Sequence, residues 1–272
     1  MCARIICGTR SLRHPPNEAT HMTPGFRITA STGLHKGDRE YQQDQVLLLS
    51  HARVTGCILG VVADGMGGRS GGRKASDQVM MTAKQLFERF DPYADDAMTM
   101  LKHIVAEAHL VIKLTAISAE EEPHSTAALF LITPAGQCYW AHAGDSRIYH
   151  FHKDQLVKRT LDHSYVQTLV DRGEITAEEA NSHPDSNILL GCLGTEAEPT
   201  VDVHMQPQLQ AGDVIMACSD GVWHYFTDTE LATVLSGMPA RDATELLIEK
   251  ARSRARGTGD NLSLIVIQIS EL

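Results

Sequence analysis

The chain alternates short apolar runs with longer stretches of helical periodicity. The run at 56–64, GCILGVVAD, is almost continuously apolar, which is typical of a strand that is buried on both faces. Apolar residues then recur at spacings of three and four over 79–90 and again over 101–112, which predicts two amphipathic helices. Asp91-Pro92 stands between them, so these helices are expected to form an antiparallel pair.

The remaining predicted strands are short, and several follow one another directly. They are 26–32 (FRITAST), 45–50 (QVLLLS), 125–133 (STAALFLIT), 137–144 (QCYWAHAG), 146–152 (SRIYHFH), 155–159 (QLVKR), 201–207 (VDVHMQP), 213–220 (DVIMACSD) and 261–269 (NLSLIVIQI). Two short helices broken at Gly173 are predicted over 163–182, and two more over 227–236 and 240–255. Because the pattern contains few βαβ crossovers, it favours an α+β sandwich over a doubly wound sheet.

The composition is that of an ordinary soluble globular protein. The chain has 272 residues, of which 43% are hydrophobic and 21% are charged. The formal charge of −10 argues against a nucleic-acid partner, and no stretch approaches the ~20 apolar residues of a membrane span. The six cysteines form no CxxC pair and no zinc-like spacing, which favours a reduced, cytoplasmic protein.

Five aspartates stand at the edges of apolar strands, most of them beside a glycine: Asp44, Asp64, Asp145, Asp220 and Asp260. An isolated Asp-Gly step is a turn signal, so each of these residues alone is explained by a turn. Asp64 and Asp220, however, end buried-looking strands with the same step. The two sheets are therefore expected to present equivalent carboxylates at one rim.

Carboxylates that converge need compensating charge. They repel one another, and burying them unpaired is costly, so arginine partners or divalent cations are expected. Oxygen ligands without paired histidines or cysteines favour Mg²⁺ or Mn²⁺ over zinc. The 14 histidines form no HExxH or comparable pair, and most are interpreted as surface or hydrogen-bonded residues.

Six stretches, taken in order, resemble the successive motifs of one enzyme family. They are DREYQQD (38–44), VVADGMGG (61–68), AHAGDSRIY (141–149), DHSYVQTLV (162–170), ACSDGVW (217–223) and GTGDNLSLIVI (257–267). From about Phe26 onward the chain resembles the metal-dependent type 2C (PPM) serine/threonine protein phosphatases in their bacterial form. The resemblance implies an α+β fold with a central β-sandwich of two mostly antiparallel sheets, flanked by antiparallel helix pairs.

The same resemblance implies a reaction and a set of metal ligands. It implies hydrolysis of phosphoserine and phosphothreonine by direct attack of a hydroxide that bridges two Mn²⁺ or Mg²⁺ ions. Carried over by position, Asp64 would bridge both ions, and the carbonyl of Gly65 would ligate one of them. Asp220 and Asp260 would complete the shell of the first ion, and Asp44 would serve the second. The glycines after Asp64 would then allow close approach of cation and phosphate.

Further positions match the family's motifs or depart from them. Arg39 matches the arginine that binds the substrate phosphate, and Asp145 matches a ligand of a weaker third ion. Met66 follows Asp64-Gly65 where some relatives carry a histidine proposed to protonate the leaving oxygen, so the identity of the general acid stays open. Residues 163–200 resemble the mobile flap of bacterial members and the segment after it.

The domain organisation follows from the extent of the resemblance. Residues 25–272 are expected to form a single phosphatase catalytic domain that contains the flap. Residues 1–24 lack the apolar core of a secretory signal, and they are interpreted as a disordered leader or as an overlong start before Met22.

Two other functions compete with an active protein phosphatase. A non-catalytic relative that binds phosphorylated partners would be expected to lack one of the acids, and none is missing. A two-metal nuclease or small-phosphoester hydrolase would use similar carboxylates, but the acidic balance weighs against nucleic acid. The expected partners are phosphoserine and phosphothreonine proteins, with an opposing serine/threonine kinase, and the expected state is a monomer.

Overall fold

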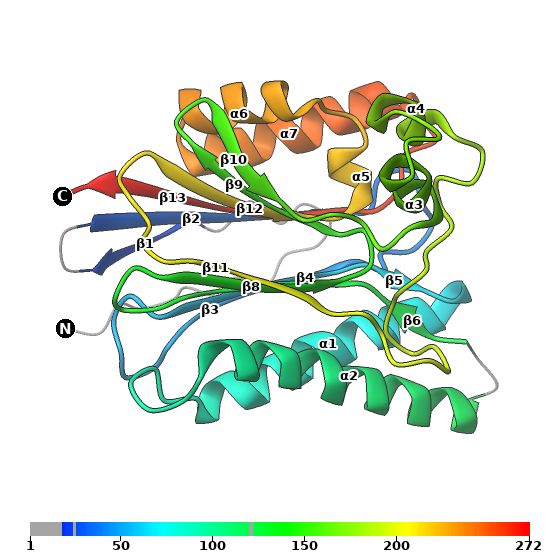
Figure 1. Cartoon of the computed structure of the whole chain (residues 1–272), viewed down its shortest axis with the longest axis horizontal. Helices are drawn as coiled ribbons and strands as arrows, with labels where there is room; N and C mark the ends of the chain where they lie inside the picture. Colours follow the sequence, from blue (N-terminus) through cyan, green and yellow to red (C-terminus); the bar gives the residue numbers. More distant parts are fainter. Residues whose placement is uncertain (1–17, 24–25, 120–121) are drawn as a thin grey trace.

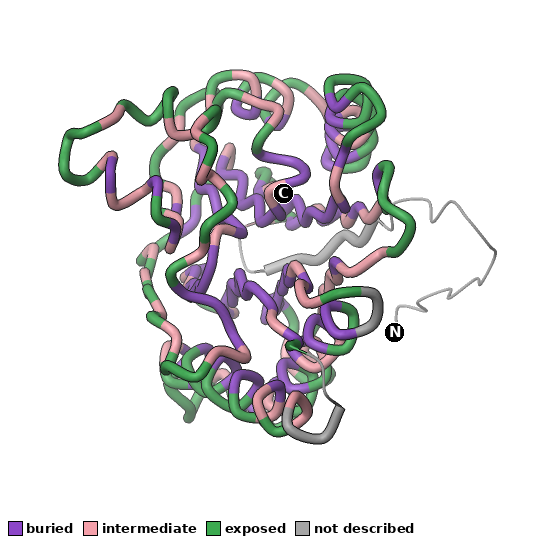
Figure 2. Tube along the Cα trace, turned by 90° about the vertical axis from the view of Figure 1, so that its right-hand side faces the viewer, coloured by how far each residue is buried: buried purple, intermediate pink, exposed green. Residues whose placement is uncertain are grey.

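Two antiparallel sheets pack face to face, and helices cover both outer surfaces of this sandwich (Figure 1). The computed structural model describes residues 18–23, 26–119 and 122–272. Figure 2 shows buried chain in the central layers and exposed chain on the outer helices. The predicted α+β sandwich flanked by helix pairs is confirmed.

The first sheet has six strands and the second has five. The first runs in the order β1 (Glu18–Thr23), β2 (Phe26–His35), β13 (Leu262–Glu271), β12 (Asp213–Cys218), β9 (Arg147–His152) and β10 (Gln155–Arg159). The second runs in the order β11 (Asp202–Gln206), β8 (Cys138–Ala143), β7 (Ala127–Ile132), β4 (Ile58–Ala63) and β3 (Gln45–Ser50). A two-stranded ladder joins β5 (Gly65–Met66) to β6 (His124–Ser125). Every strand pair in the described residues is antiparallel.

Two helix pairs form the outer layers. The helices α1 (Gly68–Arg89) and α2 (Ala97–Ala119) cover the five-stranded sheet, and α6 (Asp228–Gly237) and α7 (Ala240–Ala255) cover the six-stranded sheet (Figure 1). Their apolar faces and the sheets form three buried layers, with one between the sheets and one under each helix pair. Burial of apolar surface in these layers drives the fold, because the free energy gained is proportional to the area removed from water.

Helix α1 begins earlier than its apolar periodicity indicates. The sequence predicts this helix from residue 79, whereas the structure begins it at Gly68, within the glycine-rich stretch. Gly67 and Gly68 take positive φ values of 121° and 77°, which let the chain turn from β5 into the helix. A Cβ atom on Gly65 would lie 2.0 Å from the carbonyl oxygen of Gly72, so these two glycines let the first turns of α1 pack on β5.

The N-terminal region contains a strand that the sequence does not predict. Residues 18–23 form β1, which pairs in register with β2, whereas 1–24 is expected to be a disordered leader. Edge pairing uses backbone groups, so a polar segment such as EATHMT joins a sheet without an apolar pattern. The rest of the expected leader lies outside the described residues.

The predicted flap contains two short helices that project from one end of the sandwich (Figure 1). They are α3 (Tyr165–Asp171) and α4 (Ala177–Ser182), separated at Gly173, whose φ of 70° ends the first. At the base of the flap the Tyr165 N–H donates to the Ile188 carbonyl oxygen at 2.9 Å. Among the described residues, no helix is both long and apolar enough to cross a membrane.

Candidate active site

Antiparallel pairing brings four of the predicted aspartates to one end of the sandwich. Asp44 directly precedes β3 and Asp64 directly follows β4, and these two strands are paired from Gln45 with Ala63 onward. Asp220 follows β12 and Asp260 precedes β13 in the other sheet, and those strands are also paired. In each sheet one strand ends where its partner begins, so both sheets present two carboxylates at the same rim.

Direct side-chain contacts join the two sheets at this rim. Ser219, between β12 and Asp220, donates through Oγ to Asp44 Oδ2 at 2.7 Å. The guanidinium of Arg39 donates to Asp260 Oδ2 at 2.5 Å, while 60% of the Arg39 side chain stays exposed. The arginine is thus held beside the carboxylates and open to solvent.

A hydrogen-bonded frame holds Asp64 and connects it to the turn that carries Asp145. The Asp64 N–H donates to Thr126 Oγ1 at 3.0 Å, and the Thr126 N–H donates to the Asp64 carbonyl oxygen at 2.9 Å. Thr126 Oγ1 in turn lies 2.7 Å from Ser146 Oγ, next to Asp145. The indole N–H of Trp223 donates to the Asp145 carbonyl oxygen at 2.9 Å, so this turn is fixed from both sheets.

The carboxylates disfavour one another's charge. Burial is the largest cause that raises the pKa of Asp44, to about 7, with repulsion from Asp220 and Asp260 added to it. Burial and repulsion from Asp260 raise the pKa of Asp220 to about 6. The pKa values of Asp64 and Asp145 are raised well above the usual range, again by burial first and then by the neighbouring acids. This cluster therefore requires positive charge to be fully ionised near neutral pH.

The donor set fits divalent cations that prefer oxygen. Asp44 Oδ1 and Asp220 Oδ1 are buried and have no hydrogen-bond partner among the described residues. A buried carboxylate oxygen without a partner is costly unless it meets a cation. Carboxylate oxygens and a backbone carbonyl are the ligands of Mg²⁺ and Mn²⁺, and the residues at this rim match that requirement.

A cavity of about 370 Å³ lies between these carboxylates and the flap. Asp145, Asp220 and Asp260 line it on one side, and residues of α3 and α4 line it on the other. Asp44, Asp64 and Arg39 are not among its lining residues. The cavity therefore extends from the carboxylate rim toward the flap and is not centred on the rim.

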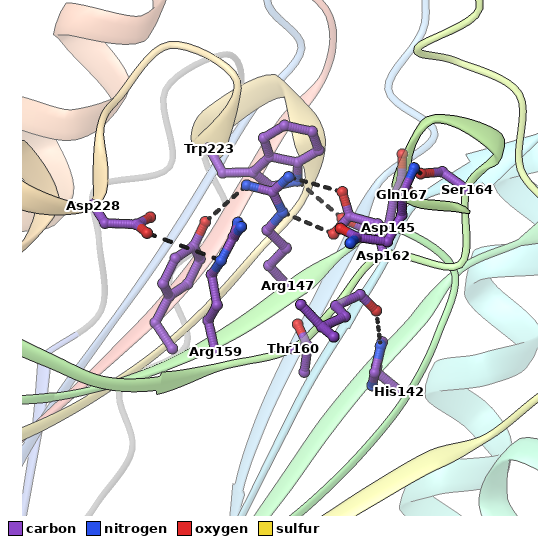
Figure 3. Close-up of polar contacts among 12 residues, drawn as sticks. His142, Asp145, Arg147, Arg159, Thr160, Asp162, Ser164, Gln167, Trp223 and Asp228 are labelled. Carbon is purple, nitrogen blue, oxygen red and sulfur yellow. Dashed lines mark hydrogen bonds and ion pairs between the residues drawn. The ribbon is translucent and has the colours of Figure 1, made fainter. Parts of the chain in front are cut away.

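Arg147 ties the start of the flap to this cavity (Figure 3). Its guanidinium makes two hydrogen bonds to Asp162, at 2.8 and 2.7 Å, and lies 3.4 Å from the centroid of the Trp223 ring. Asp162 is the residue before the flap, and Trp223 closes α5 (Asp220–Trp223), which also carries Asp220. One buried cation thus joins the flap to the helix that carries a carboxylate of the rim.

Sequence reasoning missed several residues that support the site. Asn261 receives the Gln43 N–H at 2.6 Å and donates to the carbonyl oxygens of Lys36 and Tyr41, both at 2.9 Å. It therefore fixes the loop that carries Arg39 and Asp44. Asn261 and Ser219 each adjoin a predicted aspartate, in GTGDN and ACSDG, but only the fold shows what they contact.

Comparison with known proteins gives the same class. The model of the protein phosphatase 2C family matches residues 34–244 of the chain. The serine/threonine phosphatase stp of Listeria monocytogenes is 32% identical over 212 residues, which is 76% of this chain and 83% of that protein. The serine/threonine protein phosphatase PstP of Mycobacterium tuberculosis is 33% identical over 220 residues, which is 79% of this chain and 41% of that protein.

Solved structures agree with the architecture. A crystal structure of the M. tuberculosis serine/threonine phosphatase PstP superposes with a TM-score of 0.77 at 30% identity, over 90% of this chain and 99% of that one. The catalytic domain of PstP in complex with two manganese ions superposes with a TM-score of 0.75 at 27% identity, over the same shares of the two chains.

The chain therefore belongs to the protein phosphatase 2C family, a family of metal-dependent enzymes. It is a serine/threonine protein phosphatase of the kind found in bacteria. The fold, the family and the class of enzyme predicted from the sequence are confirmed.

Proposed function

We propose that the rim of carboxylates is the catalytic centre and that it hydrolyses phosphoserine and phosphothreonine in proteins with two Mn²⁺ or Mg²⁺ ions. The observation that carries this proposal is the convergence of four aspartates beside an exposed, anchored arginine. Buried carboxylates that lie close together need compensating positive charge, and divalent ions with oxygen ligands would supply it.

The ligands are assigned residue by residue. Asp64 would contact both ions, with the Gly65 carbonyl on one of them, Asp220 and Asp260 on the first ion and Asp44 on the second. The unpartnered oxygens of Asp44 and Asp220 support these assignments, because each has a lone pair that no described group uses. When bound, two divalent ions would lower the pKa of a coordinated water molecule toward about 7, which would make a nucleophile available near neutral pH.

Arg39 would bind the substrate phosphate. Its planar guanidinium can donate two parallel hydrogen bonds to phosphate oxygens, and a lysine could not reproduce that geometry. Its contact with Asp260 fixes the guanidinium next to the carboxylates, and this contact is the largest cause that raises the pKa of Arg39. The arginine therefore stays charged and orients the phosphate without taking part in proton transfer.

Asp145 would hold a weaker third ion. Its carboxylate lines the cavity beside the flap, and its turn is fixed by Trp223 and by the Ser146 contact. A third ion there would lie between the two-ion centre and the flap.

Met66, which lies next to the proposed metal centre, supplies no proton donor for the leaving group. Met66 is half-buried in β5, directly after Gly65, and a thioether cannot protonate a leaving oxygen. We therefore propose that water protonates the leaving serine or threonine oxygen.

The cellular setting follows from the same proposal. The enzyme would act as a monomer in the cytoplasm on proteins phosphorylated by a serine/threonine kinase. The four cysteines in the described part of the chain are free and buried, and burial raises the pKa of the Cys192 thiol to about 11, which keeps that thiol unreactive. Such a pattern suits a reducing compartment.

The test compares substrates and metal conditions. A phosphothreonine peptide and a generic aryl phosphate are each incubated with Mn²⁺ and with a chelator, and released phosphate is measured. Mn²⁺-dependent release from the peptide supports the proposal. Release from the aryl phosphate alone favours a small-phosphoester hydrolase, and no release from either refutes the assignment of this rim as a catalytic centre.

A further inference from the structure

Two histidines and one aspartate meet at the base of the flap, away from the aspartate rim. His142 lies on β8, His163 stands where the flap begins, and Asp202 is the first residue of β11, directly after the flap segment. One ligand atom from each of the three lies within 4.8 Å of the others. The imidazole rings stack with centroids 4.5 Å apart, and His163 Nε2 is 3.4 Å from Asp202 Oδ2.

His142 is oriented as a metal-binding histidine would be. Only 2% of the residue is exposed, and its Nε2–H donates to the Leu161 carbonyl oxygen at 2.8 Å (Figure 3). This bond places the free lone pair on Nδ1, which is buried and has no partner among the described residues. Metal-binding imidazoles usually donate their second nitrogen to a backbone carbonyl or a carboxylate in this way. Burial is the largest cause that lowers the pKa of His142, and this favours the neutral ring that binds metals.

His163 and Asp202 complete the set. His163 Nε2 is also buried and lacks a hydrogen-bond partner in the described part of the chain. The Asp202 side chain is 60% exposed, which gives an ion a route from solvent and leaves room for a water ligand. In a tetrahedral site with metal–ligand distances of about 2.0–2.1 Å, ligand atoms stand about 3.3 Å apart. The 3.4 Å separation of His163 Nε2 and Asp202 Oδ2 already matches that spacing.

We propose that His142, His163 and Asp202 bind a zinc ion, with water as the fourth ligand. Two imidazoles and one carboxylate favour zinc, whereas the all-oxygen rim favours Mg²⁺ or Mn²⁺. Binding requires one rearrangement. The Gly144 N–H donates to His163 Nδ1 at 3.3 Å, and this long hydrogen bond is lost when Nδ1 carries the proton and Nε2 binds the metal.

The position of the site gives it a mechanical role. His163 and Asp202 stand at the two ends of the flap segment, and His142 lies on β8 directly opposite Asp202 on β11. Gly144 and Asp145 follow β8 directly, so the same strand leads to the cavity. A zinc ion here fastens the start of the flap, at His163, to β8 and β11 of the five-stranded sheet and thereby steadies one wall of the cavity. This inference does not depend on the catalytic role of the rim.

The first experiment measures zinc binding to the full chain in excess Mg²⁺, which occupies oxygen sites and competes poorly for imidazole. Zinc affinity is determined by competition with a chromophoric chelator in the wild type, in Asp202→Ala and in His142→Gln. The matched control is His204→Ala. His204 lies on the same strand as Asp202, and its ring packs on Trp140 outside the cluster. Asp202 is exposed, so its replacement tests the site even if His142→Gln fails to fold.

We expect one zinc ion per wild-type and His204→Ala chain, and an affinity weaker by about 100-fold in Asp202→Ala. Anomalous scattering at the zinc edge should place the ion between the two imidazoles, and zinc should slow amide exchange over 163–190 in the wild type and in His204→Ala but not in Asp202→Ala. Equal zinc affinity in the wild type and Asp202→Ala, no bound zinc, or a zinc peak elsewhere would each overturn the proposal.

Discussion

The hydrogen bond from Ser219 to Asp44 offers a sharp test of how the rim is built. Ser219 is fully buried, donates to Asp44 Oδ2 at 2.7 Å and accepts the Ser263 N–H at 3.1 Å. Ser219→Ala removes both contacts and changes no charge. It therefore leaves a buried carboxylate oxygen and a buried backbone N–H without their partners.

The expected loss of stability follows from these two groups. Each of the two buried polar groups left without a partner costs about 1–3 kcal/mol, so the free energy of unfolding should fall by about 2–6 kcal/mol. The bond to Ser219 also lowers the pKa of Asp44, so its loss strengthens the competition of protons with metal ions. If Asp44 is a metal ligand, its apparent Mn²⁺ affinity at pH 7 should weaken by up to about tenfold for each unit of added pKa shift.

Urea denaturation in the presence of a chelator measures the first effect, and calorimetric titration with Mn²⁺ measures the second. The control is Ser31→Ala, because Ser31 is also fully buried but its Oγ has no hydrogen-bond partner among the described residues. Ser31→Ala should change stability little. If Ser219→Ala is as stable as this control and binds Mn²⁺ as the wild type does, the proposed support of Asp44 is wrong.

Three further outcomes are expected. Arg147→Lys breaks the paired hydrogen bonds to Asp162 inside the protein, and the free energy of unfolding in urea should fall by about 3 kcal/mol, whereas an unchanged midpoint would contradict this. Burial raises the pKa of Asp213, but hydrogen bonds from two histidines and a backbone N–H outweigh it and hold the pKa below the usual range. The stabilisation is therefore present above about pH 4 and lost as the pH falls through the folded-state pKa, so the wild type should exceed Asp213→Asn in thermal stability at pH 6 and approach it at low pH. A constant difference would exclude this linkage. Asp145→Ala should lower turnover while anomalous scattering still shows two manganese ions, and loss of either ion would reassign Asp145 to the main centre.

The local pattern of apolar and polar residues predicted most of the strands and helices and the aspartates at the rim. The apolar run before Asp64 and the run before Asp220 predicted buried strands, and antiparallel pairing then brought their ends together. The pattern did not predict the start of α1 or the strand β1, because backbone packing and backbone hydrogen bonds determine both. Helix α1 begins at Gly68 because Gly65 and Gly72 can touch, and β1 forms through backbone bonds that carry no apolar signature.

Contacts between distant segments lay beyond the sequence argument. Asn261 holds the loop that carries Arg39, and Ser219 donates a hydrogen bond to Asp44, which precedes a strand of the other sheet. Nothing in the sequence around Asn261 or Ser219 identifies these partners. The sequence indicates only that most of the histidines are surface or hydrogen-bonded residues. His142 and His163 come from different elements, so only the folded chain shows that their rings stack beside Asp202.

The most direct test of the central claim is the turnover of Asp64→Asn on a phosphothreonine peptide. The amide keeps the size of the side chain and removes the charge that is proposed to contact both ions. The control variant is Asp154→Asn, which replaces an exposed aspartate in the turn between β9 and β10. With Mn²⁺, the wild type and this control should release phosphate at equal rates, and Asp64→Asn should release none above background. Circular dichroism confirms that all three proteins are folded. Turnover by Asp64→Asn at the wild-type rate, or wild-type turnover in a chelator, would contradict the account.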